Sequence, residues 1–226
     1  MIKLYELSGK SSVIFSPYCW RVRLALLHKQ LKFSSIETAF TDIKKIPDGR
    51  FKTVPVLCDD EININDSFNI VEYLEAAYPT KPSLFKSSEG RALSMFIEAW
   101  ANSLHSDIAR MAIADIYSHL QDKDKTYFRE TRESSFGKNL EIVQEESLEL
   151  AKESFLVKLN LLEKHLIKTE FIGGDCPLYP DFIVFGSLQW LLTTSHHFEI
   201  NNLPDNTKIW FSKICTIYGI KNKEFE

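Results

Sequence analysis

Residues 15–21 read Phe-Ser-Pro-Tyr-Cys-Trp-Arg, and this stretch decides how the first part of the chain must fold. It has the form of a redox-type thiol motif in which a serine, Ser16, stands in place of the leading cysteine. A hydroxyl can hold a thiolate by a hydrogen bond but cannot form a disulfide with it. Proline favours the first helical position and serine favours the N-cap before it, so Pro17 predicts a helix that starts beside Ser16.

The residues on either side predict a strand before this stretch and a helix after it. Residues 2–7 form an apolar, β-prone run, and Val22, Leu26 and Leu31 follow at helical spacing. Ser16 therefore lies at a helix N-terminus, which favours negative charge through its unpaired N–H groups and its dipole. A sulfur anion bound there would have a lowered thiol pKa. Taken alone, the pattern also fits an ordinary serine N-cap.

Two later segments add to this picture. Pro55 interrupts a β-branched run at residues 53–57, where it removes a ladder hydrogen bond unless the chain forms an edge, a bulge or a cis turn. Asp66 and Ser67 precede apolar residues at helical spacing over residues 70–78, which predicts a second polar helix start. A serine hydroxyl with unpaired N–H groups suits a carboxylate, and an aspartate suits an ammonium group. Both groups occur on the end of an α-amino acid.

The three segments together resemble the glutathione-binding half of a glutathione transferase, from about residue 2 to residue 78. The resemblance implies a thioredoxin-like domain that binds glutathione as a co-substrate. It makes Ser16 the catalytic residue at the start of the first helix. Tyr18 would also lie at this site, where it could reach the sulfur or the second substrate, and simple packing is the alternative.

The resemblance assigns the rest of the glutathione site as well. Val54 and Pro55 correspond to a pair joined by a cis peptide, and the Val54 backbone would bind the cysteinyl part of glutathione as an added strand does. Asp66 and Ser67 would hold the γ-glutamyl end. The commoner acidic-type residue in the family is Glu or Gln, so Asp66 has a shorter reach. Within the superfamily, residues 15–29, 40–42 and 181–190 are similar to the bacterial and fungal β-etherase-like branch, which includes enzymes that use glutathione to cleave β-aryl ethers.

The expected fold is α/β plus all-α. We expect a thioredoxin-like domain with a mixed four-stranded sheet and helices over residues 1–79, and a linker rich in proline, lysine and serine over residues 80–87. An all-helical domain that carries the second-substrate site follows over residues 88–226. Its apolar spacing predicts one long amphipathic helix from residue 88 to residue 112 and further helices over residues 140–166, 180–194 and 207–219. Asp181 begins the third of these without the family's usual Ser or Thr three residues earlier.

The first helix of that domain supplies the candidates for the second-substrate site. His105 is the only titratable group among them and could assist a leaving group. Core packing is the alternative for each apolar member. The candidates are Trp100, Leu104, His105, Ile108 and Met111. Cys19 has the position of a resolving cysteine, and we expect it to be buried and inert. Arg21 and Arg23 are expected at the surface or at the junction of the domains.

Composition excludes several classes of function. The chain has 226 residues and a formal net charge of −4, which argues against a nucleic-acid partner. There is no signal-peptide pattern at the start and no apolar run of the ~20 residues that span a bilayer, so we expect a cytoplasmic protein without a membrane partner. The four scattered cysteines lack zinc-ligand spacing, which predicts no metal.

The sequence thus predicts a transferase in which Ser16 activates the glutathione thiol for attack on a hydrophobic electrophile, by conjugation or by cleavage of an aryl ether. The alternative is a non-catalytic protein of the same fold that binds glutathione or hydrophobic ligands. A thiol-disulfide reductase would need a nucleophilic cysteine at residue 16. A homodimer is usual in the family and is expected here.

Overall fold

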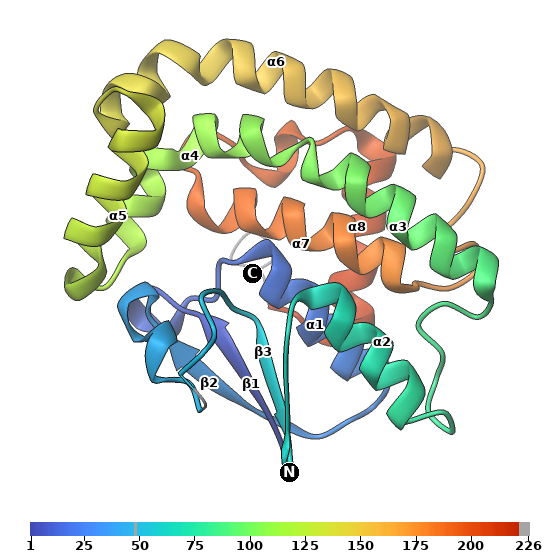
Figure 1. Cartoon of the computed structure of the whole chain (residues 1–226). Helices are drawn as coiled ribbons and strands as arrows, with labels where there is room; N and C mark the ends of the chain where they lie inside the picture. Colours follow the sequence, from blue (N-terminus) through green and yellow to red (C-terminus); the bar gives the residue numbers. More distant parts are fainter. Residues whose placement is uncertain (48, 222–226) are drawn as a thin grey trace.

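The structure, a computed structural model, describes residues 1–47 and 49–221. It has the expected fold, with a mixed four-stranded sheet and helices followed by an all-helical part (Figure 1). The strand order is β2-β1-β3-β4, in which β1 is parallel to β2 and antiparallel to β3, and β3 is antiparallel to β4. The strands are β1 (Ile2–Leu7), β2 (Phe33–Thr38), β3 (Val56–Asp59) and β4 (Ile62–Asn65).

The two α-helices of the N-terminal part begin where the sequence predicts. Ser16 is the N-cap of α1 (Pro17–His28), and its Oγ accepts a hydrogen bond from the Cys19 amide. Asp66 is the N-cap of α2 (Ser67–Ala77), and its carboxylate accepts from the amides of Phe68 and Asn69. Two short 3-10 helices, η1 (Lys10–Ser12) and η2 (Phe40–Lys45), complete this part.

The C-terminal part is built from helices stacked above α1 and α2 (Figure 1). The longest, α6, spans the predicted residues 140–166 and covers the outer side, while α7 lies in the centre of the molecule between α1 and α6. The helices are α3 (Ser88–Asn102), α4 (His105–His119), α5 (Asp122–Phe136), α6 (Leu140–Leu166), α7 (Tyr179–Thr194) and α8 (Asp205–Tyr218), with the 3-10 helix η3 (Ile200–Asn202).

One expectation for the helices was wrong, and one helix was not predicted. The single helix predicted over residues 88–112 is two helices, because the chain turns at Ser103 and Leu104 between α3 and α4. The apolar spacing continues across this turn, so periodicity alone does not show it. Helix α5 was not predicted, although its first turn carries Asp122 and Asp124 and Gly137 ends it in the left-handed conformation with φ 70°.

Helix α7 is the predicted buried helix, and its first turn is held by one carboxylate. Asp181 accepts hydrogen bonds from the amides of Ile172, Gly173 and Leu178 and from Nε1 of Trp210. Leu178 offers no side-chain acceptor, so the reciprocal half of the cap is missing, as the sequence predicts. The fully buried Asp181 compensates by joining the start of α7 to the preceding loop and to α8.

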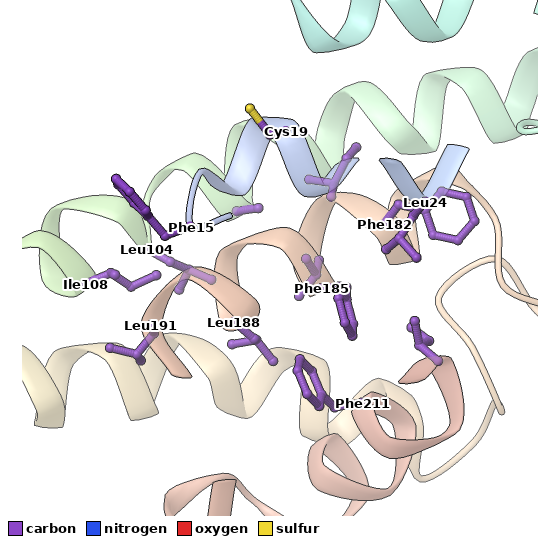
Figure 2. Close-up of a cluster of buried hydrophobic side chains, with 14 of the residues drawn as sticks. Phe15, Cys19, Leu24, Leu104, Ile108, Phe182, Phe185, Leu188, Leu191 and Phe211 are labelled. Atoms are coloured by element: carbon purple, nitrogen blue, oxygen red, sulfur yellow. The ribbon is translucent and has the colours of Figure 1, made fainter. Parts of the chain in front are cut away.

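Helix α1 lies against α7 so closely that a side chain at Gly186 has no room. A Cβ atom there would be 2.4 Å from the carbonyl oxygen of Pro17, in the first turn of α1. Below this contact, Phe185 stacks on Phe211 of α8 with ring centroids 4.5 Å apart (Figure 2). The core therefore continues from one part of the chain into the other through α7.

The two parts are also joined by polar contacts. Arg21 is completely buried and donates to Glu98 Oε1 at 2.8 Å and to Asn102 Oδ1 at 3.0 Å, both on α3. A second contact between the two parts comes from α5, where the Asp124 carboxylate accepts from the amides of Phe40 and Thr41. Arg21 thus lies at the domain junction and not on the surface.

Replacing Gly186 by alanine tests the contact between α1 and α7. Helix propensity alone predicts that Gly186→Ala raises the free energy of unfolding by up to about 1 kcal/mol. The clash with the Pro17 carbonyl predicts the opposite, a decrease of about 1–3 kcal/mol, as overpacking does in cores. Urea denaturation decides between the two signs, and an increase in stability would contradict the described contact.

Candidate active site

A cleft of about 450 Å³ lies between the N-terminal part and helices α4, α5 and α7. Ser16 and Tyr18 of α1, Val54 of the loop before β3, and His105 of α4 all line it. Four residues that the sequence singled out from three separate segments therefore meet in one cavity. Most of the remaining wall is aromatic or aliphatic, and its aromatic members are Phe15, Phe40, Tyr127, Phe128, Phe136 and Trp190.

Ser16 lies at the N-terminus of α1 with only 5% of its surface exposed. Its Oγ accepts from the Cys19 amide at 3.4 Å, which uses a lone pair and leaves the hydroxyl hydrogen as a donor. The positive end of the helix dipole and the unpaired N–H groups of the first turn of α1 lie at this same N-terminus. This position suits an anionic group in the cleft next to the hydroxyl.

The pairing of the strands explains why the Val54–Pro55 loop meets Ser16. Tyr5 pairs with Val56, so the end of β1 and the residues before β3 lie at the same edge of the sheet. The Val54–Pro55 peptide is cis, as the resemblance implied. Within residues 1–47 and 49–221, neither the Val54 amide nor its carbonyl has a hydrogen-bond partner. Both groups can therefore pair with an extended peptide.

Asn65 fixes this loop. Its Nδ2 donates to the carbonyl oxygens of Thr53 at 3.0 Å and Pro55 at 3.2 Å. Since Val56 pairs with Asn65, the loop also lies next to the start of α2. The segments around Val54 and Asp66 are therefore neighbours in space, although Val54 precedes β3 and Asp66 follows β4 in the sequence.

At the start of α2, Asp66 has φ 77° and ψ 129°, an uncommon conformation for a residue other than glycine. Its side chain is exposed, while the Ser67 hydroxyl is buried without a hydrogen-bond partner of normal geometry among the described residues. Burial raises the pKa of Glu98, and the Asp66 carboxylate raises it further against the opposing charge of Arg21. Glu98 is thus a second carboxylate, besides Asp66, near the start of α2, and the sequence did not single it out.

Tyr18 and His105 contact each other across the domain boundary. The Tyr18 hydroxyl lies 3.3 Å from His105 Nδ1, and His105 Nε2 lies 2.9 Å from Ser187 Oγ. The Ser187 hydroxyl donates to the Ile183 carbonyl, so it accepts from His105 Nε2–H, and Nδ1 accepts from Tyr18. Burial, helped by the charge of Arg21, lowers the pKa of His105 to about 3. His105 is therefore a neutral group that orients the Tyr18 hydroxyl, and not an acid near neutral pH.

The structure corrects the prediction for the second-substrate site. Leu104, Ile108 and Met111 are completely buried and belong to the core, and Trp100 on α3 does not line the cleft. The turn before α4 determines which face looks inward, and these residues share the inner one. The adjacent face carries the cleft-lining residues of α4, which are His105, Ala109, Ile113 and Ile116.

The sequence missed the wall that α5 provides, because it missed the helix. Tyr127, Phe128, Arg132 and Phe136 of α5 all line the cleft. Lys52 lines the opposite side, next to Thr53 and Val54. Lys52 thus places a cation in the cleft beside the Val54 loop.

Cys19 lies inside the N-terminal part and does not line the cleft. Burial and the nearby Glu6 charge raise the pKa of its thiol to about 12, against the opposing effect of the Ser16 hydroxyl. The sulfur accepts from the Leu7 amide and points away from the Phe185 and Leu188 cluster (Figure 2). A thiol with this pKa is protonated near neutral pH, which fits the expected inert role.

Two family models together match most of the chain. The glutathione S-transferase N-terminal domain matches residues 12–82, and the glutathione S-transferase C-terminal domain matches residues 92–204. The chain belongs to the glutathione S-transferase family. These matches identify the family and do not distinguish serine-type members or the β-etherase-like branch within it.

Individual members of the family agree with this membership. The glutathione S-transferase-like protein ustS of Aspergillus flavus is 26% identical over 208 residues, covering 80% of this chain and 74% of that protein. Glutathione S-transferase Z1 of Arabidopsis thaliana is 40% identical over 82 residues, and the match covers 33% of this chain and 36% of that protein.

The fold itself is shared with solved glutathione S-transferases. The crystal structure of an enzyme of this family from Ceriporiopsis subvermispora, in complex with glutathione, has a TM-score of 0.84 to this chain at 23% sequence identity, and the match covers 96% of each chain. At this identity the likeness shows the fold. Within residues 1–47 and 49–221, no helix is long and apolar enough to cross a bilayer, and no group of three or more metal-ligating side chains occurs.

The state of His105 can be measured directly. We expect the NMR signals of its ring to show the neutral Nε2–H tautomer from pH 8 down to pH 5, because its pKa is lowered to about 3. The unfolded chain takes up a proton at a pKa of about 6.5, so this group reduces the free energy of unfolding as the pH falls below that value. A protonation step between pH 6 and pH 7 would contradict the described contacts.

Proposed function

We propose that the protein is a serine-type glutathione transferase, in which Ser16 stabilises the thiolate of bound glutathione for attack on a hydrophobic electrophile. The observation that carries this proposal is the Ser16 hydroxyl at the N-terminus of α1, in a cleft that also holds the unpaired Val54 backbone. Solved proteins of this fold in complex with glutathione support it.

The residues present fit glutathione along its length. The Val54 amide and carbonyl would pair with the cysteinyl backbone, which places the sulfur toward Ser16. Asp66 and Glu98 would hold the γ-glutamyl ammonium group, and the Ser67 hydroxyl with the first amides of α2 would hold its carboxylate. Lys52 precedes the Val54 loop and would hold the glycyl carboxylate.

In the proposed reaction, the main role of the protein is to stabilise the negative charge on the sulfur. The thiol loses its proton to solvent, and the Ser16 hydroxyl donates a hydrogen bond to the sulfur anion while the helix dipole favours it. The sulfur then forms a bond to an electrophilic carbon, and the leaving group departs with its electron pair. When the carbon belongs to a β-aryl ether, the leaving group is a phenoxide. For the assembly, we still expect a homodimer. For the location, we still expect the cytoplasm.

Replacing Ser16 by alanine tests the role of the hydroxyl. We expect the thiolate absorbance of bound glutathione near neutral pH to disappear and turnover of 1-chloro-2,4-dinitrobenzene to fall about 10²-fold or more, as loss of one charge-stabilising donor does. Glutathione affinity should change little. Ser16→Thr keeps a hydroxyl and the helix cap and should retain most of the thiolate signal. An unchanged thiolate signal in Ser16→Ala would overturn the role of Ser16.

Ser67 provides the complementary test of binding. We expect Ser67→Ala to weaken glutathione binding about tenfold, since its buried hydroxyl would lose a charge-assisted hydrogen bond to the γ-glutamyl carboxylate. The pKa of the bound thiol should stay as in the wild type, because Ser67 lies on α2 and not at the sulfur. Calorimetry measures the affinity. Equal affinity in the two proteins would remove Ser67 from the glutathione site.

A further inference from the structure

The charge of the cleft has one sign only. Of the described residues that line it, Lys52 and Arg132 carry positive charge and none carries a carboxylate. This contrasts with the whole chain, which has 31 acidic and 27 basic residues. The first turn of α1 adds the positive end of a helix dipole at Ser16. A neutral electrophile has no anionic group that could pair with either of these two cations.

Arg132 is the cation whose role the glutathione site does not explain. Its guanidinium carbon lies 5.1 Å from the ring centroid of Phe128 and 5.8 Å from that of Phe40, and its Nη1 donates to Thr131 Oγ1 at 3.2 Å. It forms no ion pair with any carboxylate of residues 1–47 and 49–221. One turn earlier, by contrast, Arg129 pairs with two glutamates on α5 and α6.

Two acidic side chains of α5 near Arg132 already have other partners, because Glu133 pairs with Arg129 and Asp124 binds η2. Asp124, about two turns before Arg132 on α5, is completely buried, and its two oxygens accept from the Phe40 amide, the Thr41 amide and the Thr41 hydroxyl. It anchors η2 and does not neutralise Arg132. Arg132 is therefore a half-buried cation on an aromatic wall of the cleft, with donors left for an anion.

Glutathione itself does not supply that anion. Its γ-glutamyl carboxylate belongs at the start of α2, and its glycyl carboxylate belongs next to Lys52, because Lys52 directly precedes the Thr53–Val54 segment. Arg132 lies on α5 of the C-terminal part and is surrounded by aromatic residues that would contact the second substrate, whereas Lys52 belongs to the N-terminal part. The two cations thus serve two different molecules.

We propose that the second substrate is an aromatic electrophile that carries a carboxylate, and that Arg132 binds this carboxylate while the ring packs against Phe40 and Phe128. This inference rests on the proposed function, since it takes glutathione as the other substrate. A guanidinium that is partly desolvated on aromatic rings binds a carboxylate by two parallel, charge-assisted hydrogen bonds. An uncharged partner cannot form this charged pair, so the guanidinium binds a carboxylate in preference to it.

A matched pair of electrophiles tests the proposal. With 4-chloro-3,5-dinitrobenzoate and its neutral amide, the glutathione sulfur bonds to the ring carbon, the C–Cl bond breaks, chloride leaves with the electron pair, and the thiol proton goes to solvent. The ratio of kcat/KM for acid over amide is compared among variants, so the different intrinsic reactivities of the two probes cancel. We expect Arg132→Met to lower this ratio at least about tenfold and Arg132→Lys to retain most of it.

A control variant excludes a general effect of net charge. Arg110 is an exposed residue of α4 that does not line the cleft, so Arg110→Met removes the same charge elsewhere. It should leave the acid-to-amide ratio unchanged. An equal ratio in the wild type, Arg132→Met and Arg110→Met would overturn the proposal, and so would an equal fall in both methionine variants.

Equilibrium binding separates this proposal from the proposed function. Calorimetry with the glutathione conjugates of the two probes gives the preference for the carboxylate without any turnover. A preference that is lost in Arg132→Met but kept in Ser16→Ala supports the inference, even if the wild type shows no catalysis and the proposed function fails. Turnover with no preference in binding or in kcat/KM leaves the transferase and overturns the inference. If neither conjugate binds, both are overturned.

Discussion

The close packing of α1 on α7 determines where the candidate active site lies. The Pro17 carbonyl occupies the space that a side chain at Gly186 would need, so the first turn of α1 is held directly against the central helix of the other part. Ser16 and Tyr18 belong to that turn, and Ser187 follows Gly186 in α7. The position of the Ser16 hydroxyl and the contact chain from Tyr18 through His105 to Ser187 therefore depend on the same approach of two helices.

Two polar contacts join the two parts of the chain at further places along their boundary. Arg21 joins α1 to α3 near the start of α2, and Asp124 joins α5 to η2. Each uses a completely buried charged side chain that forms hydrogen bonds across the domain boundary. Breaking either would leave a buried group without its partners, which is costly in free energy. The walls of the cleft are thus held to one another, although they come from distant parts of the sequence.

The sequence predicted the features that depend on local chemistry. A proline after a serine, a proline in a β-branched run, and an aspartate before a helix each state a local backbone requirement, and Ser16, Pro55 and Asp66 have the predicted places. Features that depend on the direction of a helix face were harder. Leu104, Ile108 and Met111 have the spacing of a cleft wall and of a core face alike, and only the turn between α3 and α4 decides for the core. The α5 wall was missed because its polar outer surface gives a weak apolar period.

The burial of Cys19 has a consequence for the lifetime of a protein that handles reactive electrophiles. In the proposed function, every molecule in the cleft is selected for its tendency to alkylate sulfur, and a protein thiolate beside Ser16 would be consumed irreversibly. The Cys19 thiol lies only three residues from Ser16, yet burial keeps its pKa near 12, so it remains protonated and sealed from the cleft. The only nucleophilic sulfur at the site then arrives with glutathione and leaves with the product. In that function, serine at residue 16 and the buried thiol at residue 19 leave no cysteine among the described residues that line the cleft.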